Sequence, residues 1–450
     1  MLASLERLAF SIQRVTLENG LRVVLNQDSG SPTVAVSVTY DVGARNEAPG
    51  RTGFAHLFEH MMFQGSKNVK RGQHFALISE RGGTLNGTTS ADRTNYFESL
   101  PSSELELALF LEADRMRWLS VTADNLENQR AVVKEEYRLR VDNAPYAKAR
   151  IRLLELAFRD YAPYAHPTIG SMQDLDAAKL EWVQQFFASH YGPNNAVLTI
   201  AGDFDTDRAV EWVRKYFGAA ERRPAPPFVE GAAPAPAAQA AQGTAPASAT
   251  GVVPGAPMRD VIEDINVKTP GLYFAYRIPP RLTKDHAALE LAALLLADGE
   301  SSRLYQRLVR ERPLLQSVRA WTNDHRGPDL FGLFAALADK SKVPEAERLL
   351  AGEIERLRTR APLPSELDRI KSRLKQRFVF DFQANRTRAV RLGEYEVFFG
   401  DARTVLRELE SYLAVTPEDV KRVAGEYLSP GRRITVEVQP SSARPGGTKP

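Results

Sequence analysis

The sequence of 450 residues contains no cysteine. This absence excludes disulfide frameworks, zinc ribbons, iron–sulfur clusters and thiol nucleophiles, so any metal must be held by histidine and carboxylate side chains. An excess of charge of one sign is also missing, because 59 Lys and Arg residues face 56 Asp and Glu residues and leave a net charge of +3. A charge this small and dispersed argues against a nucleic-acid partner.

Long apolar runs are absent as well. No stretch approaches the ~18 consecutive apolar residues of a membrane span, so we expect none. Near the start of the chain, Glu6 and Arg7 stand where a secretory signal would keep an uncharged apolar run. We therefore expect no export signal in the sequence as given, which leaves the periplasm if a signal has already been removed and the cytoplasm otherwise.

One segment separates the chain into two parts of similar size. Residues 224–257 are rich in Pro and Ala and lack an apolar period, which predicts a linker. On either side, residues 1–223 and 258–450 each open with strand-like alternation, continue into helical patterns and end in a β-branched strand. We therefore predict an α+β fold of two similar domains, each a mainly antiparallel sheet with helices packed on it.

The first part carries two histidines four residues apart in an apolar helical run from Phe54 to Gly65. At about 100° per residue, His56 and His60 lie on one helix face about a turn apart, with Glu59 beside them. Two imidazoles on one face can share a metal ion while a carboxylate stands by its water. The order His-x-x-Glu-His is the inverted zinc-protease motif. The alternative is an amphipathic helix that happens to carry two histidines and a solvated glutamate.

A catalytic zinc usually has three protein ligands, so a third ligand is needed from elsewhere. The helical segment from Asn125 to Leu139 offers two adjacent carboxylates, Glu135 and Glu136. With Val132 as the origin, an apolar stripe forms in which Glu136 falls inside and Glu135 outside. The other members of this stripe are Leu126, Val133, Tyr137 and Leu139. We therefore expect Glu136 to point inward as the third ligand, with Glu135 as the alternative.

These residues resemble the pitrilysin/insulinase family of zinc metallopeptidases, in the subgroup of the mitochondrial processing peptidase and its bacterial relatives. The resemblance rests on His56-Leu-Phe-Glu59-His60 and on Glu136 within Asn-Gln-Arg-Ala-Val-Val-Lys-Glu-Glu, and further family-like segments extend it over nearly the whole chain. It implies half of a clam-like chamber, Zn²⁺ bound by His56, His60 and Glu136, and Glu59 as the general base of an endopeptidase. In many relatives, a Glu that supports the metal ligands from behind stands where this chain has Gln129. The neutral amide of Gln129 can hydrogen-bond but adds no negative charge.

Candidate substrate-binding residues follow the zinc helix. The Gly-rich polar segment from Gly82 to Thr89 predicts an edge strand on which a peptide could add by β-augmentation, and the resemblance implies the same. A hairpin with its own partner strands is the alternative. Asn86 is a candidate for hydrogen bonds to the substrate backbone and Tyr96 a weaker one, although both could be packed core residues.

The second part lacks a feature of the resembled family, an Arg followed seven residues later by a Tyr that bind substrate carbonyls. Val309 and Gln316 stand at the corresponding positions, and if the register is off by one, Arg310 or Arg312 could replace the Arg. The resemblance therefore implies the zinc-bearing subunit of a heterodimer, whose homologous partner supplies the Arg/Tyr pair.

The predicted function is zinc-dependent hydrolysis of peptides or unfolded segments. One alternative is a non-hydrolytic scaffold or assembly subunit of the same fold. Another is a metal-storage or sensor domain, which would not need Glu59 placed as a base.

Overall fold

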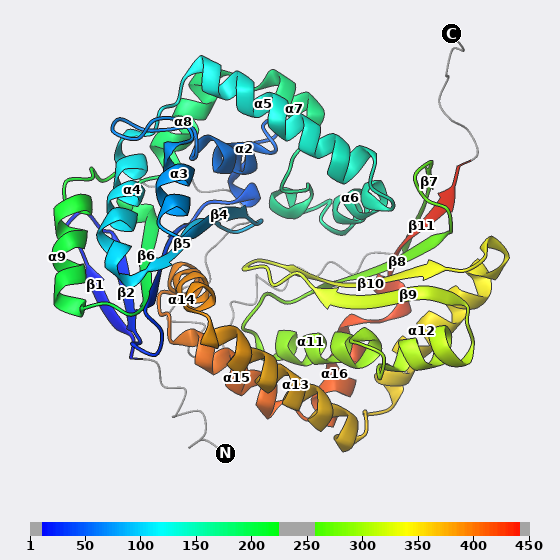
Figure 1. Ribbon diagram of the computed structural model, residues 1–450. Coiled ribbons are helices and arrows are strands. Elements are labelled where there is room, and N and C mark those ends of the chain that lie inside the picture. The colour runs from blue at the N-terminus through cyan, green and yellow to red at the C-terminus, as the bar shows by residue number, and fades with distance from the viewer. Residues whose placement is uncertain (1–10, 225–256, 442–450) are drawn as a thin grey trace, which may run out of the picture. The chain divides into compact units, whose positions relative to one another are not determined.

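The computed structural model describes residues 11–224 and 257–441, whose contacts divide them into two compact units (Figure 1). The predicted linker, except for its two end residues, lies outside the described residues. The first unit takes its described residues from 11–135, 167–224 and 376–407, and the second from 136–166, 257–375 and 408–441.

The first unit contains a six-stranded sheet in the order β1-β2-β6-β3-β5-β4. Neighbouring strands are antiparallel except for the parallel pair β2 and β6. Strands β3 and β6 are buried along almost their whole length because they occupy the middle of the sheet, whereas β4 forms one edge. The strands are β1 Gln13–Thr16, β2 Arg22–Gln27, β3 Thr33–Tyr40, β4 Thr84–Thr89, β5 Thr94–Pro101 and β6 Ala196–Gly202.

The second unit contains a five-stranded sheet in the order β7-β11-β8-β10-β9, with β7 and β11 parallel and the other pairs antiparallel. When β1 is set aside, both sheets run through their first, fifth, second, fourth and third strands in chain order. The two units are therefore similar α+β domains, as the sequence predicted. The strands are β7 Met258–Asp264, β8 Gly271–Ile278, β9 Leu315–Thr322, β10 Asp329–Leu337 and β11 Ile434–Pro440.

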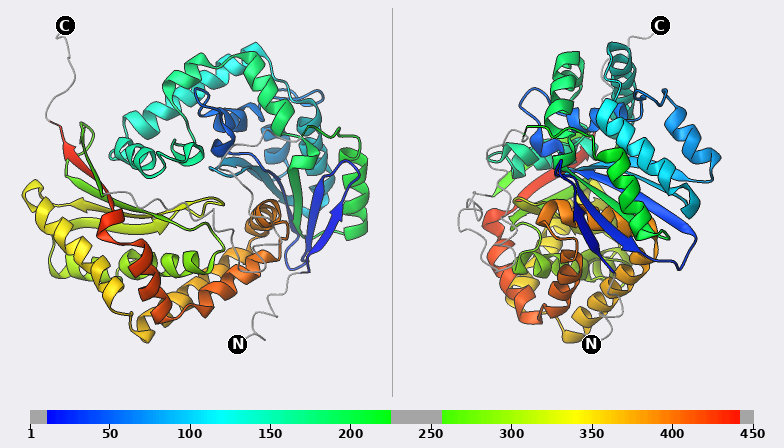
Figure 2. Two further views of the ribbon diagram at one scale, coloured as in Figure 1. Left: turned by 180° about the vertical axis from the view of Figure 1, so that it is seen from behind. Right: turned by 90° about the vertical axis from the view of Figure 1, so that its left-hand side faces the viewer.

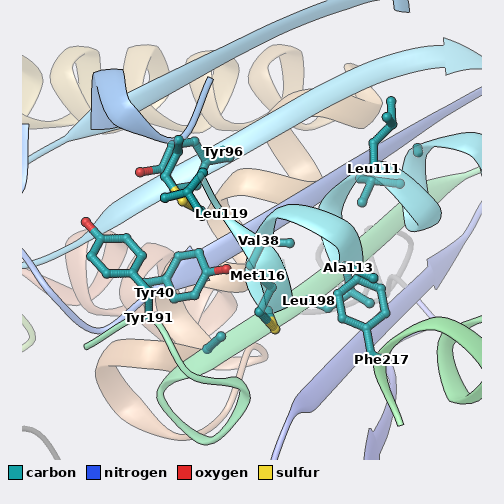
Figure 3. Packing of buried hydrophobic residues seen from close by; sticks show 14 of the residues in the cluster. Val38, Tyr40, Tyr96, Leu111, Ala113, Met116, Leu119, Tyr191, Leu198 and Phe217 are labelled. Carbon is teal, nitrogen blue, oxygen red and sulfur yellow. The ribbon is translucent and has the colours of Figure 1, made fainter. Parts of the chain in front are cut away.

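Helices cover both faces of the first sheet. One face packs against a core of strand and helix side chains. Figure 3 shows part of this core, in which Val38 and Leu198 of the strands lie near Met116 and Phe217. The other face is covered by α14 (Asn385–Phe399). The remaining helices of this unit are α2 Phe54–Met61, α3 Gln73–Glu80, α4 Leu105–Trp118, α5 Ala123–Tyr137, α7 Met172–Ala177, α8 Leu180–His190 and α9 Thr206–Phe217.

Helices likewise lie on both faces of the second sheet (Figure 2). Helices α11 (Lys284–Ala297), α12 (Val343–Thr359) and α16 (Pro417–Tyr427) share one core with the sheet, and α6 (Ala147–Ala157) packs on β8 and β11. Helices α13 (Pro364–Gln383) and α15 (Thr404–Ala414) each contain a boundary between the units. Within the described part of the chain, none of the helices combines the length and apolar character needed to cross a bilayer.

The two units do not coincide with the predicted halves 1–223 and 258–450, because each half lends a helix to the other sheet. Helix α14 of the second half covers the first sheet, and α6 of the first half covers the second. The fit of α14 is close: a Cβ at Gly393 would lie 2.8 Å from Oγ1 of Thr39 and 2.9 Å from Oγ1 of Thr199. A change in composition marks the linker but not the boundary between the packed units. Each sheet needs helices on both faces, and this requirement decides which helix packs on which sheet.

Candidate metal centre

Helix α2 carries both histidines and Glu59. It begins after Gly53, which adopts a positive φ of 87°. The carboxylate of Glu47 accepts hydrogen bonds from the backbone N–H groups of Gly53 (2.8 Å) and Ala55 (2.7 Å) and so satisfies donors at the helix N-terminus. Helical periodicity did not predict this role of Glu47, because the residue lies in the loop before the helix. The helix ends at Met61, earlier than the predicted Gly65, which adopts a positive φ of 98° four residues beyond it.

The two histidines lie together on one face of α2. His56 is buried, with 8% of its surface exposed, and His60 is half-buried. Their ring centroids are 4.9 Å apart. On the other side of the helix, Leu57 and Phe58 are fully buried, and the Phe58 ring packs 4.3 Å from that of Tyr191. The apolar face therefore fixes the rotation of α2 and with it the direction of both imidazoles.

Helix α5 buries only part of the predicted apolar stripe. Leu126 and Val133 of that stripe are buried, as predicted. Val132 and Leu139 were assigned to the same stripe, but they are 45% and 61% exposed. The true inward face is thus rotated by about 90° from Val132 toward Val133. The helix also stops at Tyr137 and continues as a π-helical turn, which carries Leu139 away from the helical register.

The corrected face still separates the two adjacent carboxylates. Glu136 is half-buried, with a side chain that is 17% exposed, whereas Glu135 is exposed. Arg140, itself exposed, lies 2.9 Å from Oε1 of Glu136. Gln129 is buried and donates a hydrogen bond to Oδ1 of Asn128 (2.7 Å). The boundary between the units falls after Glu135, but α5 runs through Glu136 as one continuous helix.

The structure brings His56, His60 and Glu136 together, with their ligand atoms all within 4.8 Å of one another. Two imidazole nitrogens and one carboxylate oxygen form a donor set that suits zinc and leaves a coordination position open. One buried and two half-buried side chains hold these donors where a water or a substrate can still reach them. The residues present therefore fit a zinc ion.

Strand β4 fixes the position of Glu59. The hydroxyl of Thr89 donates a hydrogen bond to Oε2 of Glu59 (2.5 Å). At Gly87, an added Cβ would lie 3.0 Å from Cγ and 3.3 Å from Oε1 of Glu59, so only glycine lets the strand come this close. Both residues belong to the predicted edge strand, but the sequence did not predict their contact with Glu59. The two-residue period of a strand, which puts Gly87 and Thr89 on one face, was the available signal.

The two predicted substrate-binding residues have different surroundings. Asn86 is exposed on β4, the edge strand of the sheet. Tyr96 is fully buried, and the guanidinium of Arg115 lies 4.5 Å from its ring centroid. Burial raises the pKa of Tyr96 well above its usual range, so its phenol stays neutral. Tyr96 therefore fits the alternative of a packed core residue, because its side chain belongs to the core of which Figure 3 shows a part.

In the second unit, the two positions without the family's Arg/Tyr pair lie in the π-helical segment Tyr305–Glu311 and at the start of β9. Val309 is half-buried against the second core. Gln316 is exposed on β9, the edge strand of the second sheet. Arg310 and Arg312 are also exposed.

Comparisons with known proteins extend over most of the chain. Residues 22–171 match the family model of the insulinase peptidases (peptidase family M16), and residues 178–374 match the model described as the inactive domain of peptidase M16. The zinc protease PqqE of Helicobacter pylori is 28% identical over 429 residues, which cover 95% of this chain and 93% of that relative.

Two solved structures show the same likeness. The crystal structure of a protease from Helicobacter pylori superposes with a TM-score of 0.87 and 27% identity, covering 96% of this chain and 100% of the other. The periplasmic protease PqqL from Escherichia coli shares the fold with a TM-score of 0.74 and 18% identity, covering 96% of this chain but 48% of its own.

Proposed function

This chain belongs to peptidase family M16, the insulinase family, and on that premise we propose that it is a zinc-dependent endopeptidase. The observation that carries the proposal is the grouping of His56, His60 and Glu136 within 4.8 Å, with Glu59 next to His60 on the same helix. In this proposal His56, His60 and Glu136 hold Zn²⁺ and Glu59 is the general base.

When bound, zinc polarises a water molecule and the carbonyl of the scissile peptide bond. Glu59 accepts the proton of that water through a carboxylate oxygen and then donates it to the leaving amine. The hydroxyl of Thr89 orients the carboxylate, and Gly87 leaves room for it beside the strand. No covalent intermediate between enzyme and peptide forms in this sequence of steps.

The substrate is a peptide or an unfolded polypeptide segment that binds in an extended conformation. Strand β4 pairs with β5 on one side, and in the described part of the chain no strand covers its other side. A peptide can therefore extend the sheet through backbone hydrogen bonds. Exposed Asn86 offers an amide to the same backbone. On the other face, the hydroxyl of Thr89 and the space left at Gly87 place Glu59 next to the bound strand.

We further propose that the active enzyme is a heterodimer with a homologous chain. Val309 and Gln316 cannot replace an Arg/Tyr pair that holds substrate carbonyls, because a Val side chain and a neutral amide lack the charged fork of Arg. The fold of this chain fills 48% of the length of PqqL, which leaves room there for a second copy of the fold. A chain that has it once would need a partner to complete the same arrangement.

The decisive experiment is a quenched-fluorescence peptide cleavage assay on the zinc-loaded chain, alone and with the partner that carries the Arg/Tyr pair. We expect little cleavage by the chain alone, because misplacing the substrate by about 1 Å costs on the order of 100-fold. Addition of the partner should restore cleavage, and a partner variant without the Arg or the Tyr should not. Full activity of the chain alone, unchanged by the partner, would reject the heterodimer.

The same assay separates the peptidase from a non-hydrolytic scaffold subunit. A scaffold would bind its partner and leave every peptide uncut, with or without zinc. Cleavage that a chelator abolishes and zinc restores would identify the enzyme.

A further inference from the structure

A second group of metal-binding side chains lies entirely within the second unit. His286 and Glu290 are on α11, and Asp324 is in the loop between β9 and β10. The ligand atoms of these three residues all lie within 4.8 Å of one another. His286 and Glu290 are four residues apart on a helix, so they share one face.

Buried Asp329, the first residue of β10, holds this group in place. Its Oδ2 lies 2.8 Å from Nε2 of His286 and accepts a hydrogen bond from the backbone N–H of Asp324 (2.9 Å). Its Oδ1 lies 3.3 Å from Nδ1 of His325 but makes no hydrogen bond, although Asp329 is fully buried. Oδ1 therefore faces the imidazole of His325, and Oδ2 faces His286 and Asp324.

The charges around the group leave an excess of negative charge. Arg281 forms a two-point ion pair with Glu408, at 2.7 and 3.2 Å, and so neutralises that carboxylate. The carboxylates of Glu290, Asp324 and Asp329 remain. The imidazoles of His286 and His325 contact Asp329, and the charge of Arg281 also acts on Asp324. The hydroxyl of Tyr412 donates a hydrogen bond to Oε2 of Glu290. Such a group is stabilised by protons or by a bound cation.

A similar group in the first unit shows what a cluster with its own cation looks like. His74, Glu98 and Glu112 also place their ligand atoms within 4.8 Å, and all three are buried. There the buried guanidinium of Arg115 donates to Oε2 of Glu112 at 2.9 Å and supplies the positive charge. In the second unit the corresponding cation is Arg281, which forms its two-point ion pair with Glu408, a residue outside the group.

We propose that His286, Glu290 and Asp324 form a second metal site, for a divalent first-row cation such as Zn²⁺ or Mn²⁺. One imidazole and two carboxylates are suitable ligands for these ions. The side chain of Asp324 is 44% exposed, so a cation can enter from solvent. The bound ion would tie the β9–β10 loop to α11.

This second site is structural and not catalytic. The residue before the second ligand is Leu289, which is fully buried, whereas Glu59 precedes His60 in the first unit. No carboxylate therefore stands where a general base would act. The proposal does not rest on peptidase activity, because its residues and its readout are independent of the first site.

The test measures zinc per chain by equilibrium dialysis and elemental analysis of the full-length protein. We expect two zinc ions per native chain and one in Asp324→Asn, with zinc at least 100-fold weaker at the altered site. Asn fits the positive φ of 59° at this position, which keeps the backbone unchanged. Asp285→Asn is the matched control on the same helix, because Asp285 pairs with Arg422 and Tyr427, and it should keep both ions.

A second measurement isolates the new site. The double variant His56→Gln/His60→Gln should still bind one zinc, and zinc should raise its melting temperature. Adding Glu290→Gln should abolish both effects, and this arm replaces Asp324→Asn if that variant fails to fold. A native chain that binds one zinc, or a double variant that binds none, would overturn the second site. If the changes at His56 and His60 remove one ion, the first site is still supported.

Discussion

Corresponding connections of the two units carry the same spacing of ligand-type residues but a different residue between them. Helix α2 lies between the second and third strands of the repeated order in the first unit, and α11 lies between the second and third strands in the second. The first has His56 and His60, and the second has His286 and Glu290. The residue just before the second ligand of the pair is Glu59 in the first unit and Leu289 in the second. The comparison teaches that metal-ligand spacing can recur without the base that makes a metal site hydrolytic.

The sharpest way to break this comparison is Glu59→Gln, which gives the first unit a neutral residue at this position. We expect cleavage to fall by about 10²–10⁴-fold, because an amide cannot accept the proton of water. Zinc content, measured in the same preparation, should stay at the native value. Near-native turnover by a zinc-loaded Glu59→Gln protein would show that Glu59 is not the base.

The second largest effect is expected at the third ligand. Glu136→Gln should weaken zinc binding at the first site by more than the about 10–100-fold that loss of a supporting residue costs. The matched control is Glu135→Gln, one residue earlier and exposed, which should bind zinc as the native chain does. Competitive chelator titrations measure both variants. The reverse pattern would move the ligand to Glu135.

A third variant tests the close approach of β4 to Glu59. Gly87→Ala places a methyl group 3.0 Å from Cγ of Glu59, so the carboxylate must shift. We expect kcat to fall by about 10–100-fold with unchanged zinc content, since small displacements of a catalytic group are costly. Gly352→Ala in α12, where an added Cβ meets nothing within 4 Å, is the control and should keep full activity. Equal kcat values for the two variants would contradict the positioning role.

The fourth prediction concerns the helix that the second half lends to the first sheet. Gly393→Ala puts a methyl group within 3 Å of two Thr hydroxyls and should destabilise the protein by about 1–3 kcal/mol. Gly352→Ala should instead stabilise it by about 0.5–1 kcal/mol, because Ala has the higher helix propensity. Thermal or urea unfolding compares the two. A stabilising Gly393→Ala would mean that α14 does not pack on the sheet as closely as described.

The last prediction concerns the buried cluster of the first unit. Burial raises the pKa of Glu98 to about 8 from its ordinary 4.5. A raised folded-state pKa gives stability that is fully present below pH 4.5 and is lost as the pH rises through 8. Native protein should therefore lose stability relative to Glu98→Gln over this range. Melting temperatures of both proteins from pH 4.5 to 8 should diverge, and parallel profiles would contradict the raised pKa.

Sequence periodicity predicted the elements better than their arrangement. The strands around Val34 and Gly271 and the metal helix were read from local alternation and spacing, which depend on near neighbours. The helical phase of α5 was misjudged because Val132 is an apolar residue that faces solvent. For Tyr96 the sequence left substrate binding and core packing open, since an aromatic residue in a strand can lie on either face.

Other features of the fold depend on residues far apart in the chain. The shared strand order places the last strand of each half between its first and second, which no local pattern specifies. The exchange of α6 and α14 between the sheets was hidden because the composition changes at the linker, whereas the packing boundaries fall within helices. Thr89 acts on Glu59 from 30 residues away, so its role appears only once β4 and α2 are side by side.

The exchange of α14 has a consequence for synthesis on the ribosome. Strand β6 ends at Gly202, but the helix that covers Val24 and Val197 on that sheet ends at Phe399. At roughly 5–20 residues per second, the ribosome needs about 10–40 s to make the intervening chain. During that interval an apolar sheet face stands uncovered in the nascent protein. The first unit is thus a domain that begins folding early and is completed late, and a chaperone that shields it would have the longest time to act there.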